Sequence, residues 1–258
     1  MSEPKKINIF HIYRKDGTSL FLHPMGKSRF FLELLESTDG GRPMEIKGLY
    51  GKEPRVESLT LFRNELYRLI EVNVKMWAGE QRFLFRFLLS TGFFLVTYFL
   101  LSMLVRDPLP MVDEILIAFG ASVALFFILG RKARGSDVAT TKRIQLREIV
   151  DQIRFIENPF LKKVESYLQQ KEGQNEQALV ETFWSGDNPF HTDPLDGEVK
   201  ELLGYLEGRF DKKLVNKFDK SLNRGIREKP SIRSSSGKKL DLPLLSTYVR
   251  LKEHCLNK

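Results

Sequence analysis

Two long uncharged stretches dominate the pattern of hydrophobic and polar positions in this chain. Residues 87–105 read FLLSTGFFLVTYFLLSMLV, and residues 115–130 read ILIAFGASVALFFILG. As a helix the first stretch is about 28 Å long, close to the roughly 30 Å hydrocarbon core of a bilayer. The second is about 24 Å long, and its basic flank can reach outward to lipid headgroups. The pattern predicts a transmembrane helical hairpin over residues 87–130.

A buried helical hairpin inside a soluble protein is the alternative interpretation of the same pattern. A helix that faces water on one side carries a polar stripe there. The stretch 87–105 is apolar on all faces, with Phe, Leu, Val and Tyr distributed around the helix. This distribution favours lipid over a soluble core.

Basic residues indicate which way the hairpin points. Nine of them flank it on the sides away from the loop: Lys75, Arg82, Arg86, Arg131, Lys132, Arg134, Lys142, Arg143 and Arg147. The loop itself carries only Arg106. Because cytoplasmic flanks are enriched in Lys and Arg, we expect a two-pass protein of the cytoplasmic (inner) membrane with both termini in the cytoplasm.

The chain carries a formal net charge of +8, which also bears on its partners. The excess lies outside the loop, because residues 106–114 contain one base and three acids. We therefore expect the lipid membrane itself to be a partner, with Arg131, Lys132 and Arg134 contacting anionic headgroups.

The first 57 residues predict a small cytoplasmic α+β module. The runs 7–13 and 19–23 are typical of strands, and Asp16-Gly17 between them suits a tight hairpin turn. An amphipathic helix starting near Ser28 and a strand over MEIKGLY follow.

Two helical arms are expected on either side of the hairpin, over residues 58–86 and 131–171. The first repeats apolar positions at heptad-like spacing, with Leu59, Phe62, Leu66, Leu69, Asn73 and Met76. The second does the same with Leu146, Ile149, Ile153, Ile156 and Phe160. We expect Leu66, Leu69, Ile149 and Ile153 to pack the arms. Coiled-coil pairing, within a chain or between copies, and amphipathic helices covering a small core are both compatible with this spacing.

The amphipathic pattern in residues 172–258 predicts a cytoplasmic helical C-terminal region. An amphipathic helix is expected from Glu198 to about Leu222, and another closes the chain. Between them, residues 224–239 are basic, serine-rich and aperiodic, which is typical of a linker. In the second arm, Asn158-Pro159 is expected to cap a new helix. The overall fold class is thus a mainly α membrane protein, a two-span hairpin with long helical arms and a small N-terminal α+β module.

Sequence motifs of catalysis are absent. No phosphate-binding loop, nucleophile elbow or dinucleotide fingerprint occurs, and the single Cys255 excludes an internal disulfide or a cysteine-based zinc site. Asp187, His191, Asp193, Asp196 and Glu198 form the richest patch of ligand types, but Asn-Pro and Asp-Pro turns explain them without a metal. We expect no enzyme activity, no cofactor or metal, no small-molecule substrate and no nucleic-acid partner.

The loop between the spans gives a second functional hypothesis. In an oligomer, Asp107, Asp113 and Glu114 would ring the outer mouth of a pore. The outline of coil, span, acidic loop, span and coil resembles that of mitochondrial calcium uniporter pore subunits. That family has a Trp-Asp-x-x-Glu-Pro pattern, whereas this loop reads Val112-Asp113-Glu114-Ile115, so the function of the family is not transferred.

These observations predict a membrane-anchored scaffold or interaction module that acts through its cytoplasmic helices, with a protein partner or further copies of itself. A subunit of a homo-oligomeric pore or cation channel is the alternative.

Overall fold

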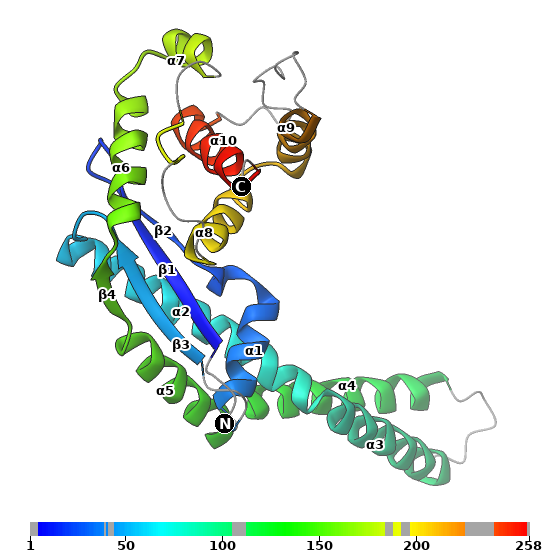
Figure 1. Cartoon of the computed structure of the whole chain (residues 1–258). Coiled ribbons are helices and arrows are strands. Elements are labelled where there is room, and N and C mark those ends of the chain that lie inside the picture. Colours follow the sequence, from blue (N-terminus) through cyan, green and yellow to red (C-terminus); the bar gives the residue numbers. More distant parts are fainter. Residues whose placement is uncertain are drawn as a thin grey trace. The chain divides into compact units, whose positions relative to one another are not determined.

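The computed structural model describes residues 5–38, 40, 44–104, 112–183, 188–191, 197–224 and 240–256 (Figure 1). The fold is mostly helical, with one four-stranded sheet that begins near the N-terminus. Two compact units divide it. The sheet unit comprises residues 1–26, 42–63 and 152–258, and the hairpin unit comprises residues 27–41 and 64–151. Each unit is described separately below.

The sheet unit has the strand order β2-β1-β3-β4. Strands β1 (Lys5–Tyr13) and β2 (Ser19–Leu22) form the expected antiparallel hairpin, and β3 (Met44–Tyr50) lies parallel to β1. The turn depends on Asp16, whose carboxylate accepts hydrogen bonds from the Thr18 amide at 2.9 Å and hydroxyl at 2.6 Å. Gly17 has a φ of +84°, which suits glycine. The Asp-Gly turn predicted from the sequence is confirmed.

The fourth strand, β4 (Arg154–Glu157), corrects the prediction for the second arm. The apolar spacing through Ile153, Ile156 and Phe160 predicted a continuing helix, but the backbone of residues 154–157 is extended and pairs in parallel with β3. Ile156 is 52% exposed there. The sheet that begins in the N-terminal module is therefore completed by residues about a hundred positions later.

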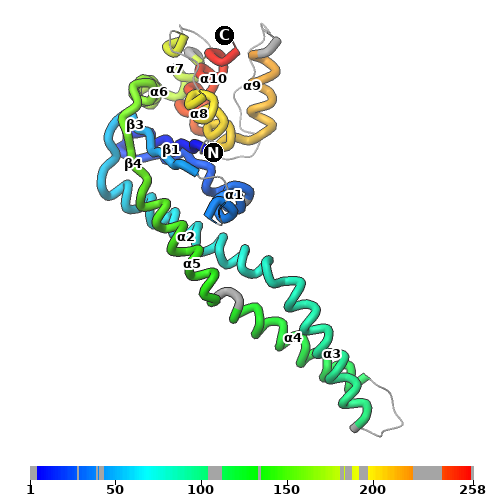
Figure 2. The backbone as a smooth tube through the Cα atoms, turned by 60° about the horizontal axis from the view of Figure 1, so that its bottom comes forward, coloured from blue at the N-terminus to red at the C-terminus, as the bar shows by residue number. Residues whose placement is uncertain are grey.

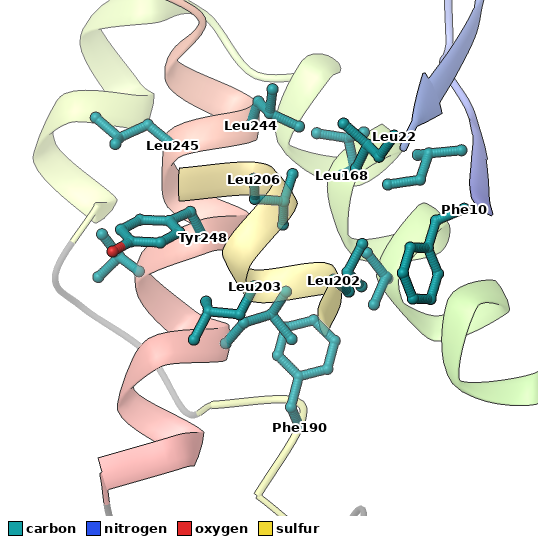
Figure 3. Close-up of a cluster of buried hydrophobic side chains, with 14 of the residues drawn as sticks. Phe10, Leu22, Leu168, Phe190, Leu202, Leu203, Leu206, Leu244, Leu245 and Tyr248 are labelled. Atoms are coloured by element: carbon teal, nitrogen blue, oxygen red, sulfur yellow. The ribbon is translucent and has the colours of Figure 1, made fainter. Parts of the chain in front are cut away.

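The C-terminal helices cover the sheet and form the main core (Figure 3). They are α6 (Pro159–Glu172), α7 (Glu176–Thr182), α8 (Gly197–Glu207), α9 (Lys212–Arg224) and α10 (Leu242–Leu256). Side chains from β1, α6, α8 and α10 meet in one cluster that includes Phe10, Leu168, Leu202, Leu206 and Tyr248. Asn158 caps α6 through bonds to the amides of Phe160 and Leu161, as the sequence predicts.

Two expectations for this region are wrong. The single helix predicted over residues 198–222 is two helices, α8 and α9, separated at residues 208–211. The closing helix α10 was expected to be amphipathic, but ten of its fifteen residues are buried, including Arg250 and His254. Residues 225–239, the core of the predicted linker, lie outside the described residues.

The hairpin unit contains α1 (Ser28–Thr38), most of α2 (Val56–Gln81), α3 (Phe83–Leu104), α4 (Val112–Arg134) and α5 (Asp137–Asp151). Helices α3 and α4 lie side by side, and the chain runs almost directly from α2 into α3 and from α4 into α5 (Figure 2). The break between α4 and α5 falls at Gly135, where the sequence allowed one. Among the described helices, α3 and α4 are long and apolar enough to cross a membrane.

Candidate functional site: the base of the apolar hairpin

The contact between α3 and α4 is made by small and polar residues. The Ser90 and Ser122 hydroxyls lie 2.8 Å apart, and each bonds to the carbonyl of the other residue, at 2.6 and 2.8 Å. Both serines are at least 90% buried, and Ala118 of α4 is fully buried. Small side chains allow two helices to approach closely, and hydroxyls can then bond between them.

Large apolar side chains of α3 and α4 lie on the outer faces of the two helices, away from their contact. Among the described residues, 19 of the 29 exposed large hydrophobic side chains lie on α3 and α4, including Phe85, Leu88 and Phe127 at more than 60% exposure. In each of the two helices, only 11% of the most apolar 18-residue segment is buried. The hairpin thus places polar atoms inside and hydrocarbon outside, the reverse of a helix pair in water.

Arg86 holds the base of this hairpin. It is 9% exposed, and its guanidinium donates to the carbonyl of Gly79 in the last turn of α2 and to that of Arg82, which follows α2. The same group lies 5.1 Å from the ring centre of Phe126 on α4. A Cβ added to Gly130 would stand 2.6 Å from Arg86 Nη1, so a larger residue there would require the end of the Arg86 side chain to shift. One side chain therefore satisfies the last carbonyls of α2 and contacts α4.

Helices α1, α2 and α5 form a group at this end of the hairpin, which we call the collar. Lys142 of α5 is 4% exposed, and its ammonium donates to the Leu35 carbonyl at 3.2 Å and the Thr38 hydroxyl at 2.5 Å. Cations are favourable beside the last carbonyls of a helix. Lys142 thus fixes the C-terminal end of α1 to α5.

Ion pairs join α2 to α5. Glu71 forms an ion pair with Arg143 at 3.2 Å and accepts a hydrogen bond from Arg147 at 3.1 Å. The Arg147 guanidinium also lies 5.4 Å from the ring centre of Tyr67. The Tyr67 hydroxyl donates to Asp151. The two predicted arms therefore contact each other within one chain through polar side chains.

The buried face of α2 differs from the predicted heptad pattern. Phe62, Leu66, Ile70, Val74 and Ala78 are buried at a strict spacing of four. Of the expected residues, Leu66 lies on this face, Leu69 is only partly buried and Met76 is 51% exposed. In the second arm Ile149 is partly buried next to the buried Val150, and Ile153, the residue before β4 in the sequence, is buried. Their role in arm packing stays a prediction.

The predicted lipid-contact and pore residues lie at opposite ends of α4. Arg131 and Lys132 are exposed in its last turns, and Arg134 belongs to the same helix end, although its side chain lies outside the described set. Asp113 is exposed and Glu114 partly exposed in the first turn of α4. Asp107 lies outside the described residues. Among the described residues, Asp113 and Glu114 therefore do not share a site with Arg131 and Lys132.

The sheet unit holds two buried titratable groups that the sequence pattern did not single out. Glu165 is 3% exposed and accepts the Tyr13 amide at 2.9 Å. Burial raises the pKa of Glu165 to about 7, although the amides of Tyr13, Lys52 and Gly51 act in the opposite direction. His11 lies 2.9 Å from the Ser19 hydroxyl, and burial lowers its pKa to about 4. Both groups connect structural elements, and neither faces a cavity among those described.

Of the patch of possible metal ligands, the structure describes only His191 and Glu198. Asp187, Asp193 and Asp196 lie outside the described residues, and Glu198 accepts the Asn158 side-chain amide at 2.8 Å. Among the residues searched, no three His, Cys, Asp or Glu side chains come together in a way that could hold a metal ion.

Sequence reasoning missed the roles of Arg86 and Lys142. It counted both only as charges beside the spans, because nothing local distinguishes a lysine that faces solvent from one that reaches a helix 107 residues earlier. Comparison with protein-family models, with curated proteins and with solved structures finds no match to this chain.

Proposed function

We propose that this chain is a two-span membrane protein that acts as a membrane-anchored scaffold through its cytoplasmic helices. The observation that carries the proposal is the reversed arrangement of α3 and α4. Ser90 and Ser122 bond to each other at the helix contact while large hydrophobic side chains face outward. In water, each exposed leucine or phenylalanine forfeits about 1.5–3 kcal/mol of burial free energy, whereas lipid removes this cost.

The proposed orientation places both termini in the cytoplasm. Arg131 and Lys132 are exposed where α4 ends, and Arg82 follows α2 directly. The first turn of α4, at the other end of the span, carries Asp113 and Glu114. Basic residues on one side and acidic residues on the other support the orientation that the positive-inside rule predicts.

A half-exposed apolar stripe on the collar supports the scaffold role. Leu69 is partly buried, Val72 is 49% exposed and Met76 is 51% exposed, and their 3-4 spacing aligns them on one face of α2. The neighbouring face of α2 is already used inside the chain by Leu66 and Ile70. We propose that the stripe Leu69–Val72–Met76 packs against the helix of a protein partner or of a second copy.

Crosslinking in native membranes tests this role. Replacing Leu69 and Met76 together by Asp should abolish the crosslinked species that contains the wild-type chain, because a helical contact does not accommodate two unpaired carboxylates. The matched control introduces Asp at Thr60 and Asn64, which are exposed polar positions of the same helix. An unchanged crosslinking pattern in the Leu69/Met76 variant, with membrane content equal to wild type, would contradict the scaffold proposal.

A pore requires a different arrangement of polar groups from a membrane anchor. A conducting pathway needs polar groups facing a shared axis, but the buried hydroxyls of Ser90 and Ser122 bond within one chain. We therefore prefer the anchor. Cation conductance in planar bilayers that falls when Asp113 and Glu114 are neutralised would reverse this preference.

A further inference from the structure

A cavity of about 340 Å³ lies between α1 and the last turn of α2. Its lining residues are Leu32, Leu35, Glu36, Trp77, Glu80 and Gln81. Helix α2 ends at Gln81, and the apolar helix α3 begins at Phe83. In the proposed topology, on which this inference rests, the cavity therefore lies at the cytoplasmic boundary of the bilayer, where lipid headgroups are found.

The lining combines three kinds of group. Trp77 supplies an aromatic surface, and tryptophan is enriched at membrane interfaces. Glu36 and Glu80 supply two exposed carboxylates, and neither forms an ion pair with a residue that the structure describes. Leu32, which is 46% exposed, supplies an apolar wall.

This combination selects a cation. An aromatic face with nearby carboxylates is the chemistry that recognises primary and quaternary ammonium groups. The two glutamates lie where basic residues predominate, because the flanks of the hairpin carry more Lys and Arg than Asp and Glu and attract anionic headgroups. A phosphate-only headgroup would meet two unpaired carboxylates here, whereas an ammonium group would neutralise them.

We propose that this cavity binds the ammonium end of a zwitterionic lipid headgroup, of the ethanolamine or choline class. Its volume lies at the lower end of the range for small-molecule sites, which suits a headgroup. The ammonium group lies over Trp77 between Glu36 and Glu80, while the acyl chains remain in the bilayer beside α3. The cavity thereby adds a selective lipid contact to the non-selective attraction of the basic flanks.

Tryptophan fluorescence of the full chain in nanodiscs tests the proposal. The chain has two tryptophans, so Trp184→Phe leaves Trp77 as the single reporter. Nanodiscs are made of phosphatidylglycerol with increasing fractions of phosphatidylethanolamine or phosphatidylcholine. We expect a saturable change in Trp77 emission that requires an ammonium lipid. In the Glu36→Gln/Glu80→Gln variant, the lipid fraction needed for half of this change should rise about threefold to tenfold.

The matched control is Glu65→Gln/Glu148→Gln, which removes two exposed glutamates of the same unit away from the cavity. It should titrate like the parent. Soluble phosphocholine added in detergent distinguishes a lipid from a free solute: a response to phosphocholine with none to ammonium lipids would overturn the proposal. Emission that is equal in all lipid mixtures, from protein that is incorporated in the discs, would also overturn it. Failure to incorporate at all would instead refute the membrane anchor.

Discussion

Three buried polar side chains connect parts of the chain that are far apart in sequence. Arg86 bonds carbonyls at the end of α2 and contacts α4, Lys142 bonds the end of α1, and Glu165 accepts an amide of β1. A buried polar group that lacks a partner costs about 1–3 kcal/mol, and a charged one costs more. These residues therefore determine which elements pack together, and they also contribute to the stability of that packing.

Glu165 gives the sheet unit a pH-dependent stability. Its pKa is raised from 4.5 to about 7 in the folded state, so the folded state holds this proton more tightly than the unfolded state. Its contribution to stability is complete below about pH 4.5 and is lost as the pH rises through 7. We expect Glu165 alone to lower the free energy of unfolding between pH 5 and pH 8 by up to about 3 kcal/mol.

Native-state hydrogen exchange of β1 and α6, corrected for intrinsic rates, measures this effect. Glu165→Gln, which cannot ionise, should remove most of the fall between pH 5 and pH 8 while lowering stability at pH 5. Equal pH profiles for the wild type and the variant would show that Glu165 does not titrate in this range. His11 acts on the acid side, because its lowered pKa makes it destabilising as the pH falls from about 6.5 towards 4.

At the scale of elements, the hairpin depends on how closely α3 and α4 approach. A Cβ at Gly130 would stand 2.6 Å from Arg86 Nη1, whereas a Cβ at Gly120 of the same helix meets no atom within 4 Å. Gly130→Val should therefore displace the end of the Arg86 side chain from the carbonyls of Gly79 and Arg82. We expect this loss of a charged donor to destabilise the hairpin by about 1–3 kcal/mol.

Thermal unfolding in detergent compares the two positions. Gly120→Val adds the same side chain to the same helix and should stay within about 0.5 kcal/mol of wild type. If the two variants are destabilised equally, β-branching in the helix rather than the Arg86 contact is the cause.

The elements that sequence analysis predicted correctly are those with local determinants. The Asp16-Gly17 turn, the Asn158 cap and the break at Gly135 each depend on neighbouring residues. Strand β4 was missed because four residues pair with a strand about a hundred positions earlier, while their apolar spacing also fits a helix. The buried face of α2 was assigned with a heptad period because both Leu66 and Leu69 fit it, but packing selected Leu66 and Ile70.

The candidate site was only partly visible in the sequence. The two apolar spans and their basic flanks could be predicted from composition, because the insertion of a segment into a membrane depends on its summed hydrophobicity. The contacts of Arg86 and Lys142 and the cavity beside Trp77 depend on helix packing between distant segments. Such pairings leave no local pattern, because the same residue types also occur on solvent-facing helices.

At the scale of the whole molecule, the proposed membrane anchor and the sheet unit differ in where their hydrophobic side chains lie. The outward faces of α3 and α4 are hydrocarbon, whereas the sheet unit encloses a conventional hydrophobic core that includes Phe10, Leu206 and Tyr248. The basic excess lies outside the loop between the spans. Together these features support the proposal that both water-soluble ends lie on one side of a membrane that the chain crosses twice.

Cysteine labelling in intact cells tests this central claim most directly. In a Cys255→Ser background, single cysteines are introduced as Leu109→Cys in the loop and as Ser2→Cys near the N-terminus. A membrane-impermeant maleimide should label the loop position in intact cells, and the N-terminal position only after the membrane is permeabilised. Labelling of the N-terminal cysteine in intact cells, or of neither position until permeabilisation, would contradict the two-span topology.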